Sequence, residues 1–170
     1  MTKLTHISLF TGIGGIDLAA EWAGFETVLM VENNAYCQKV LKKHWPDVLL
    51  ESDIYETHPK GTATLITGGF PCQPFSVAGQ QRGKGDDRYL WPEMLRVIKE
   101  IRPGWVVAEN VAGLIRMGLD DCLSDLEREG YITETFLIPA CAVNAPHRRD
   151  RIFIVAHSTS PRCEEPINEL

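Results

Sequence analysis

The chain has 170 residues, of which 44% are hydrophobic and 24% charged, with a formal net charge of −6 at pH 7. This length suits one globular domain and is too short for two full ones. No apolar run approaches a membrane span and the first residues lack a signal-peptide core, so we expect a cytoplasmic protein. Five scattered cysteines without a Cys-x-x-Cys pair disfavour a disulfide framework or a zinc site, and we expect no metal. The acidic balance confines nucleic-acid binding to local basic clusters or to a region not contained in these residues.

Hydrophobic periodicity predicts strands and helices in alternation. In chain order we expect strand 7–10, helix 14–24, strand 27–31, helix 35–44, a short strand ending near 53, strand 63–67, helix 92–101, strand 105–108, helix 119–126 closed by Gly130, and strands 135–142 and 152–156. This pattern predicts an α/β fold with a doubly wound, mostly parallel sheet and helices on both faces. In such folds the sites lie at the carboxyl ends of the strands. We assign residues 1–157 to this domain, and residues 158–170 to a tail or the start of a linker.

A glycine-rich turn directly follows the first predicted strand. Its glycines, Gly12, Gly14 and Gly15, come after Phe10 and let the backbone approach a ligand closely. A dinucleotide fingerprint would have a third glycine where this chain has Asp17. A nicotinamide-dependent oxidoreductase is therefore the weaker interpretation of this turn.

Two carboxylates follow the next predicted strands. Glu32 ends the second strand, where a carboxylate can accept both hydroxyls of a ribose. Asp53 lies where the third strand should end and can accept a hydrogen bond from an adenine amino group. Taken alone, Asp53 is more simply a cap or turn residue. Together with the glycine turn, Glu32 predicts a cofactor that contains a nucleoside, without specifying which one.

The segment Gly69-Phe-Pro-Cys-Gln-Pro-Phe-Ser76 carries the strongest functional signal. Cys72 stands between Pro71 and Pro74, each of which restricts the backbone, directly after a predicted buried strand. A cysteine on a stiff loop at a strand end is a candidate nucleophile. The alternative is an inert buried cysteine in a turn.

A carboxylate and a basic cluster complete the candidate site. Glu109 follows the strand predicted over 105–108 and is a candidate proton donor, because burial would raise its pKa. Residues 147–151, His-Arg-Arg-Asp-Arg, are the densest basic cluster of the chain. They form either an exposed turn or a site for a phosphate or a polar base edge.

Taken in order, these motifs resemble the cytosine-5 DNA methyltransferase family. The matching positions are Phe10, Gly12 and Gly14 of the first motif, Glu32, the adenine-contacting Asp53 and Ile54, residues 69–76, Glu109-Asn110-Val111, and His147, Arg149 and Arg151. Order and spacing agree to about residue 157. Two positions depart from the family pattern: His147 replaces the usual glutamine, and Asn33 stands where an adenine-packing residue can occur.

The resemblance implies transfer of a methyl group from S-adenosyl-L-methionine to carbon 5 of cytosine. Cys72 would add to carbon 6, and Glu109 would hold ring nitrogen 3 and the exocyclic amine. Arg149 and Arg151 would position the base and nearby sugar-phosphate. The implied cofactor contacts also include Gly15 and Pro71. The target base must leave the double-stranded DNA stack to reach the cysteine.

The resemblance also predicts a lid over the flipped base. Residues 76–88 combine glycines with basic side chains and would close over the base and touch phosphate. The expected base or DNA contacts in and beside it are Gln73, Ser76, Arg82 and Arg88. The alternative is a surface loop without this role.

Family members also carry a variable target-recognition region and a final conserved segment after the arginine motif, and neither occurs in these residues. We therefore expect that target recognition comes from a further region or a second polypeptide, in a restriction-modification or phage system. The rival class is a non-catalytic S-adenosylmethionine-binding or DNA-associated fragment. The joint presence of Cys72, Glu109 and Arg149 favours retained chemistry.

Overall fold

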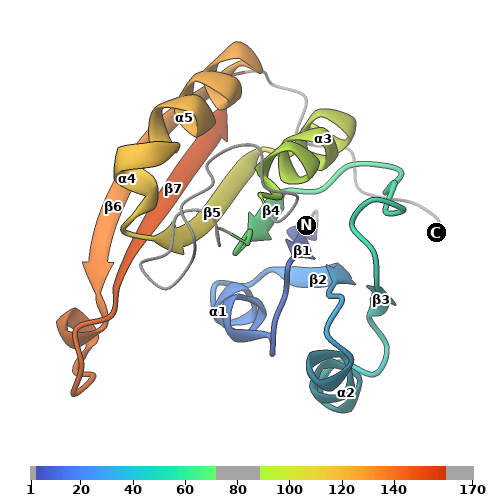
Figure 1. The fold of residues 1–170 in the computed structure, drawn as a ribbon. Helices are drawn as coiled ribbons and strands as arrows, with labels where there is room; N and C mark the ends of the chain where they lie inside the picture. The colour runs from blue at the N-terminus through green and yellow to red at the C-terminus, as the bar shows by residue number, and fades with distance from the viewer. Residues whose placement is uncertain (1–2, 72–88, 160–170) are drawn as a thin grey trace.

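The structure is a computed structural model that describes residues 3–71 and 89–159. Within them the elements are β1 (Thr5–Leu9), α1 (Gly15–Trp22), β2 (Glu26–Val31), α2 (Ala35–His44), β3 (Leu49–Glu51), β4 (Leu65–Gly68), α3 (Trp91–Ile101), β5 (Trp105–Val111), α4 (Leu114–Met117), α5 (Leu119–Arg128), β6 (Tyr131–Pro139), the 3-10 helix η3 (Ala140–Val143) and β7 (Asp150–Ser158) (Figure 1). The expected alternation of strands and helices is confirmed.

One seven-stranded sheet, in the order β3-β2-β1-β4-β5-β7-β6, organises the fold. Strands β1 to β5 are parallel, whereas β7 runs antiparallel to β5 and β6 antiparallel to β7. The chain leaves β1 toward β2 and β3 and later returns to place β4 on the other side of β1. This topological switch brings the carboxyl ends of β1, β2, β4 and β5 and the beginning of β7 to the same edge of the sheet.

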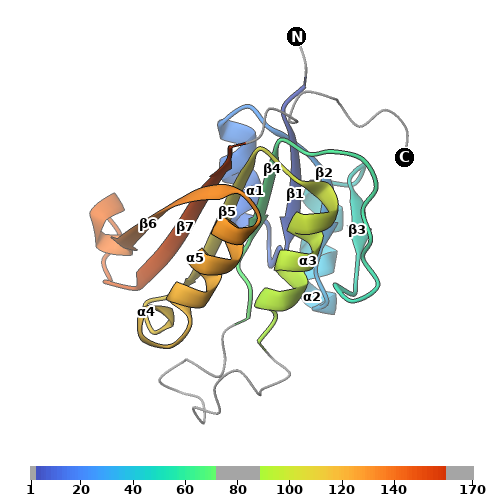
Figure 2. The same ribbon diagram turned by 90° about the horizontal axis from the view of Figure 1, so that it is seen from above.

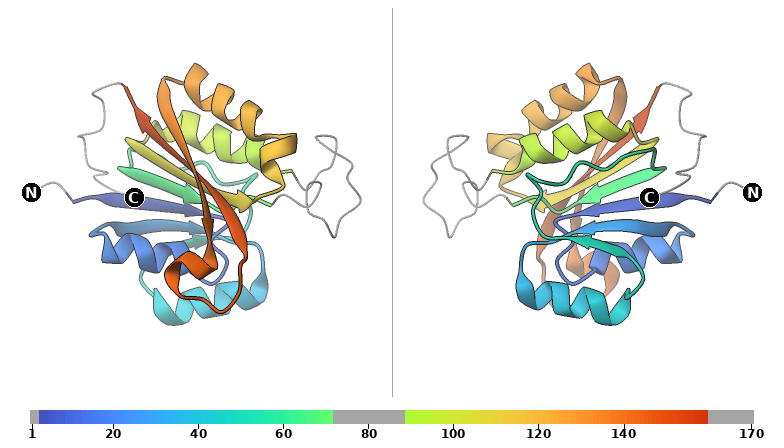
Figure 3. Two further views of the ribbon diagram at one scale, coloured as in Figure 1. Left: turned by 90° about the vertical axis from the view of Figure 1, so that its left-hand side faces the viewer. Right: turned by 90° about the vertical axis from the view of Figure 1, so that its right-hand side faces the viewer.

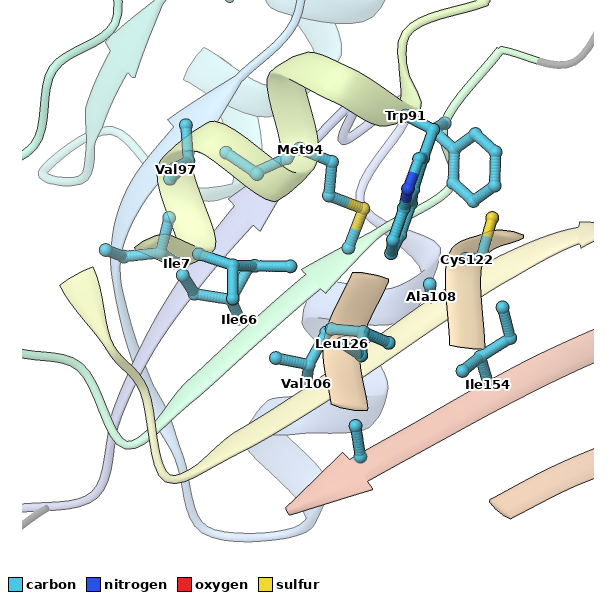
Figure 4. Packing of buried hydrophobic residues seen from close by; sticks show 14 of the residues in the cluster. Ile7, Ile66, Trp91, Met94, Val97, Val106, Ala108, Cys122, Leu126 and Ile154 are labelled. Atoms are coloured by element: carbon cyan, nitrogen blue, oxygen red, sulfur yellow. The ribbon is translucent and has the colours of Figure 1, made fainter. Parts of the chain in front are cut away.

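Helices cover both faces of the sheet, α1 and α2 on one and α3, α4 and α5 on the other (Figures 2 and 3). Helix α3 carries apolar residues at the helical spacing of Met94, Val97, Ile98 and Ile101, and all four are at most 2% exposed. They pack with Ile7, Ile66, Val106 and Leu126 among others in the core between this helix layer and the sheet (Figure 4). No helix within the described residues is long and apolar enough to cross a membrane.

The antiparallel end of the sheet differs from the sequence prediction. The strand expected over 135–142 instead begins at Tyr131 and ends at Pro139, and the next residues form η3. The reason is the hairpin with β7, which pairs Tyr131 with Ser158 and Pro139 with Asp150. The short helix α4 was not predicted.

The face of β5, β7 and β6 opposite α5 has no helix over it among the described residues. Strand β5 alternates along its length, so that Val106 and Ala108 are buried under α5 while Trp105 on the other face is 47% exposed. Cross-strand neighbours of this open face include Phe136 and Phe153, and Ile132 and His157. Nearby helix α1 also exposes apolar side chains, those of Leu18 and Trp22. We call the exposed residues Trp105, Ile132, Phe136 and Ile138 the open apolar face.

Two buried titratable side chains lie on the α1 side of β1. His6 is fully buried, with its ring nitrogens 2.9 Å from the Thr27 hydroxyl and 2.8 Å from the Thr67 hydroxyl. Desolvation lowers the pKa of His6 to about 4. Asp17 is also fully buried and accepts a 3.1 Å hydrogen bond from Ser8, while its Oδ1 has no hydrogen-bond partner among the described residues. Desolvation raises the pKa of Asp17 to about 6.

These two groups oppose each other in the pH dependence of stability. The folded protein holds the Asp17 proton up to about pH 6 while the unfolded chain releases it near 3.8, so this group lowers stability as pH rises between those values. His6 acts in reverse, because only the unfolded chain binds its proton between about pH 4 and 6.5.

Asp17→Asn should therefore make the free energy of unfolding rise with pH more steeply than in the parent, by about 3 kcal/mol between pH 4 and 7. Urea unfolding measures this, with Asp120→Asn on the exposed start of α5 as the control, and equal slopes for all three proteins would contradict it.

Candidate active site

The turn between β1 and α1 contains residues in the left-handed conformation. Phe10, which lies just outside β1, has a φ of 54°, and Gly14 has a φ of 89°. A Cβ added to Gly14 would lie 2.4 Å from the ring of Trp45, so a larger residue would collide with this side chain. At Gly12 and Gly15 an added Cβ would meet no atom of the described residues within 4 Å. The tight packing of the turn thus explains Gly14, whereas Gly12 and Gly15 leave open space.

Glu32 lies directly after β2 and is 8% exposed. Its Oε2 accepts a hydrogen bond from the Gly12 amide and its Oε1 one from the Asn34 amide, both at 2.7 Å. Gln38 of α2 donates to the Glu32 carbonyl at 2.6 Å. The carboxylate is therefore fixed at the sheet edge by both neighbouring turns. Each oxygen has a second lone pair that can accept a hydrogen bond from a hydroxyl.

A cavity of about 430 Å³ opens at this edge of the sheet. Its lining includes five of the predicted cofactor residues, which come from four separate segments: Phe10, Glu32, Asp53, Ile54 and Pro71. Asn33 and Gly69, which belong to the motifs, line it too. The other lining residues, Val31, Ser52, Tyr55 and Leu90, were not predicted. The three glycines of the first turn are not among the lining residues. The volume and the position match those of small-molecule sites in doubly wound folds.

A larger hollow of about 960 Å³ lies at the other end of β2. Its wall comes from the carboxyl ends of α1 and α2 and from the start of β2, and it includes Glu26 and Asp47. This hollow is at the amino ends of the parallel strands, away from the glycine turn. We therefore place the candidate site in the smaller cavity.

Asp53 stabilises its own turn. Its Oδ1 accepts from the Tyr55 amide at 2.9 Å, and its carbonyl accepts from the Thr57 hydroxyl at 2.8 Å. The simpler interpretation of Asp53 as a turn residue thus applies. It is compatible with ligand binding, because the exposed Asp53 also lines the cavity.

Cys72, Gln73, Ser76, Arg82 and Arg88, like the proposed lid, lie outside the described residues. The segments on either side are anchored. The Phe70 ring lies 5.3 Å from that of Trp91 and 6.3 Å from that of Tyr89, measured between centroids.

A buried asparagine anchors the first of these segments to β5. Asn110, 4% exposed, donates from Nδ2 to the Phe70 carbonyl at 3.0 Å and accepts from the Val111 amide at 2.8 Å. No separate role was predicted for Asn110. Its place beside Glu109 in the motif was the available signal.

Glu109 is a residue of β5, and the expectation that it follows the strand was wrong. Strand β5 continues to Val111 because β7 pairs with it along its whole length. The Glu109 side chain forms an ion pair with Arg151, at 2.8 Å between Oε1 and Nε. Its Oε2 is 3.3 Å from the position of a Cβ added to Gly69. The carboxylate therefore lies beside the segment that leads to Cys72.

Two opposing effects act on the Glu109 carboxyl. Burial raises the pKa of this carboxyl above its usual value, although the positive charges of Arg151 and Arg149 act in the opposite direction. The backbone of Arg149 has a φ of 40° at the corner before β7. Residues 147–149 are exposed, and Arg148 pairs with Asp150 at 2.9 Å. The cluster is thus an exposed turn that nevertheless places Arg151 on Glu109. No group of three or more potential metal ligands occurs among the described residues.

The model of the family described as C-5 cytosine-specific DNA methylase matches residues 4–169. The chain belongs to this family. The resemblance drawn from the motifs is thereby confirmed, and the chain is a cytosine-5 DNA methyltransferase domain by family.

Curated relatives of the chain include type II methyltransferases. M.PspPI of Psychrobacter sp. is 41% identical over 163 residues, which cover 90% of this chain and 39% of that protein. M.Eco47II of Escherichia coli is 36% identical over 162 residues, which cover 89% of this chain and 39% of that protein. The chain thus spans about two fifths of the length of these relatives.

A solved structure confirms the fold. The Dnmt2 methyltransferase of S. pombe superimposes with a TM-score of 0.75 at 22% identity, over 97% of this chain and 54% of that chain. The predicted doubly wound, mostly parallel sheet is therefore confirmed, and that structure shares it.

Proposed function

We propose that this chain carries the chemistry of a DNA (cytosine-5-)-methyltransferase. It would transfer a methyl group from S-adenosyl-L-methionine to carbon 5 of a cytosine in double-stranded DNA, within a restriction-modification or phage system. The observation that carries the proposal is the Glu109–Arg151 ion pair, which lies beside Gly69 at the base of the Cys72 segment. Gly69 also lines the cavity at the same sheet edge, so base chemistry and cofactor binding would meet there.

The residues of the cavity fit the cofactor. Glu32 is held in place for two ribose hydroxyls, Phe10 and Ile54 offer apolar surface to a purine ring, and Asp53 can accept from its amino group. Gly12, Gly14 and Gly15 shape the turn beside it, and Pro71 closes the side nearest Cys72. When bound, S-adenosyl-L-methionine supplies a methyl group activated by a positively charged sulfur. The cavity supplies the orientation of that group toward the base.

In the proposed reaction, the Cys72 thiolate adds to carbon 6 of a flipped-out cytosine, and carbon 5 becomes nucleophilic. Glu109, whose pKa is raised by burial, donates a proton to ring nitrogen 3 as negative charge develops on the ring. Arg151 orients the Glu109 carboxylate, and the exposed Arg149 contacts the base or nearby sugar-phosphate. After methylation, water takes the proton from carbon 5 and the Cys72 thiolate leaves from carbon 6. Ring nitrogen 3 returns its proton to Glu109, which restores the neutral aromatic ring.

We further propose that target recognition needs a region beyond these residues, in the same polypeptide or in a second one. The open apolar face supports this, because an exposed sheet face with aromatic side chains is typical of an interaction surface. The relatives are also longer, since the chain spans 39% of M.PspPI. The net charge of −6 gives the 170-residue chain little general attraction to DNA phosphates.

The cofactor assignment predicts weak but measurable binding. The isolated chain should bind S-adenosyl-L-methionine in a calorimeter, and Glu32→Ala should weaken the affinity by about tenfold through loss of the ribose hydrogen bonds. Glu26→Ala, at the other end of β2, is the matched control and should leave the affinity unchanged. Absence of both binding heat and thermal shift at millimolar cofactor would refute the assignment.

A further inference from the structure

The guanidinium of Arg96, on helix α3, holds the segment between β3 and β4. It donates to the Ile54 carbonyl at 2.6 Å and to the Thr57 carbonyl at 3.0 Å. Two carboxylates of the same helix fix its orientation, Glu93 at 2.8 Å and Glu100 at 2.9 Å. The Arg96 guanidinium thus divides its hydrogen bonds between carboxylates of its own helix and backbone carbonyls far from it in sequence.

The segment that Arg96 holds is also one wall of the cavity. Residues 52–55 line it, and within them Asp53 closes a compact turn by accepting from Tyr55 and Thr57. The segment runs beside α3 in the fold (Figure 1). In the structure Arg96 therefore contacts the cavity wall from behind and is not itself a lining residue.

Helix α3 connects this wall to a second part of the site. Leu90, which precedes the helix, lines the same cavity, and Trp91 at its start packs on Phe70. Trp91 also donates from its indole nitrogen to Asp125 of α5 at 3.0 Å. The start of the helix is thus held in place. Arg96, on the second turn, links residues 52–55 to this anchored helix.

We infer that Arg96 is a positioning residue for the cofactor site, because its guanidinium fixes the wall formed by residues 52–55 relative to the wall formed by Leu90. The inference rests on the proposed cofactor role of the cavity. Loss of the guanidinium releases two backbone carbonyls and leaves the core of α3, Met94, Val97 and Ile98, unchanged. The wall then becomes mobile, and cofactor binding becomes weaker because it must also order this segment at an entropic cost.

Hydrogen exchange on the cofactor-free chain tests the clamp itself. In Arg96→Ala, amides of residues 52–60 should exchange about tenfold faster while those of β1 and β4 stay unchanged. Arg102→Ala is the matched control, because Arg102 also donates to a backbone carbonyl, that of Glu129, on the side away from the cavity. It should leave residues 52–60 unchanged. Unchanged exchange of this segment in Arg96→Ala would overturn the clamp.

Calorimetry with S-adenosyl-L-methionine tests the consequence for binding. Arg96→Ala should lower the affinity about tenfold and Arg102→Ala less than twofold, while Arg96→Lys, which keeps the charge and can reach one carbonyl, should lie between. Faster exchange without a loss of affinity would overturn the positioning role. If Arg96→Ala speeds exchange throughout the chain, Arg96→Lys replaces it as the test variant. Faster exchange of residues 52–60 together with a lower affinity would then support the positioning role, and the absence of either would overturn it. If the parent chain does not bind the cofactor, both the proposed function and the positioning role are contradicted. The exchange result still shows separately whether Arg96 holds residues 52–60 in place.

Discussion

Replacement of Cys72 by serine is expected to abolish methyl transfer in any complex of this chain that methylates DNA. A hydroxyl is a far weaker nucleophile than a thiolate at neutral pH, so the rate should fall by roughly 10³-fold or more, as for loss of other covalent nucleophiles. Affinity for S-adenosyl-L-methionine should stay nearly unchanged, because the proposed thiol acts on the base. Incorporation of labelled methyl groups into DNA measures the first effect, and calorimetry the second.

Cys141→Ser provides the control for this prediction, since Cys141 is an exposed cysteine of η3. It should retain full activity. DNA that contains 5-fluorocytosine should trap a covalent adduct, because fluorine cannot leave carbon 5 as a proton does. Peptide mapping should locate the adduct at Cys72, and an adduct at Cys141 would refute the assignment of the nucleophile.

Residues 1–170 alone are expected to leave DNA unmethylated at any defined site. The acidic chain offers few basic groups for phosphates, and the open apolar face remains exposed to water. Addition of the carboxyl-terminal region of a relative such as M.PspPI, fused or co-expressed, should restore site-specific methylation. Bisulfite sequencing of plasmid DNA from cells that produce each version measures the outcome.

The matched control for this experiment is the same fusion with Cys72→Ser, which should give no methylation. Polar substitution of Phe136 on the open apolar face should separately reduce activity of the fused protein, because it would weaken contact with the added region. Site-specific methylation by residues 1–170 alone would show that the described domain needs no further region.

The sequence by itself determined the fold class, because the signals for it are local. Helix α2 occupies residues 35–44 as predicted, with the Asn34 side chain accepting from the Tyr36 and Cys37 amides at its start. Helix α3 differs by one residue from its predicted range, since Pro92 and the apolar spacing define it. The motifs also sufficed for the family, which residues 4–169 confirm.

The candidate site was predictable to the extent that its residues follow strands. Phe10, Glu32, Asp53, Ile54 and Pro71 line one cavity because parallel strands end at one edge of a sheet. This placement agrees with the sequence argument. Their binding roles stay predictions.

Only the tertiary structure decided the contacts between residues distant in the chain. The length of β5 depends on its ladder with β7, which joins Val111 to Arg151 and makes the ion pair of Arg151 with Glu109 possible. Gly14 is required by a ring 31 positions away, that of Trp45, and Asn110 and Arg96 act on backbone carbonyls of other segments. No repeating pattern in the sequence reveals such contacts, because they depend on where the strand order of the sheet places each segment. A local pattern therefore fixes the elements and their polarity, whereas packing decides which side chains support the site.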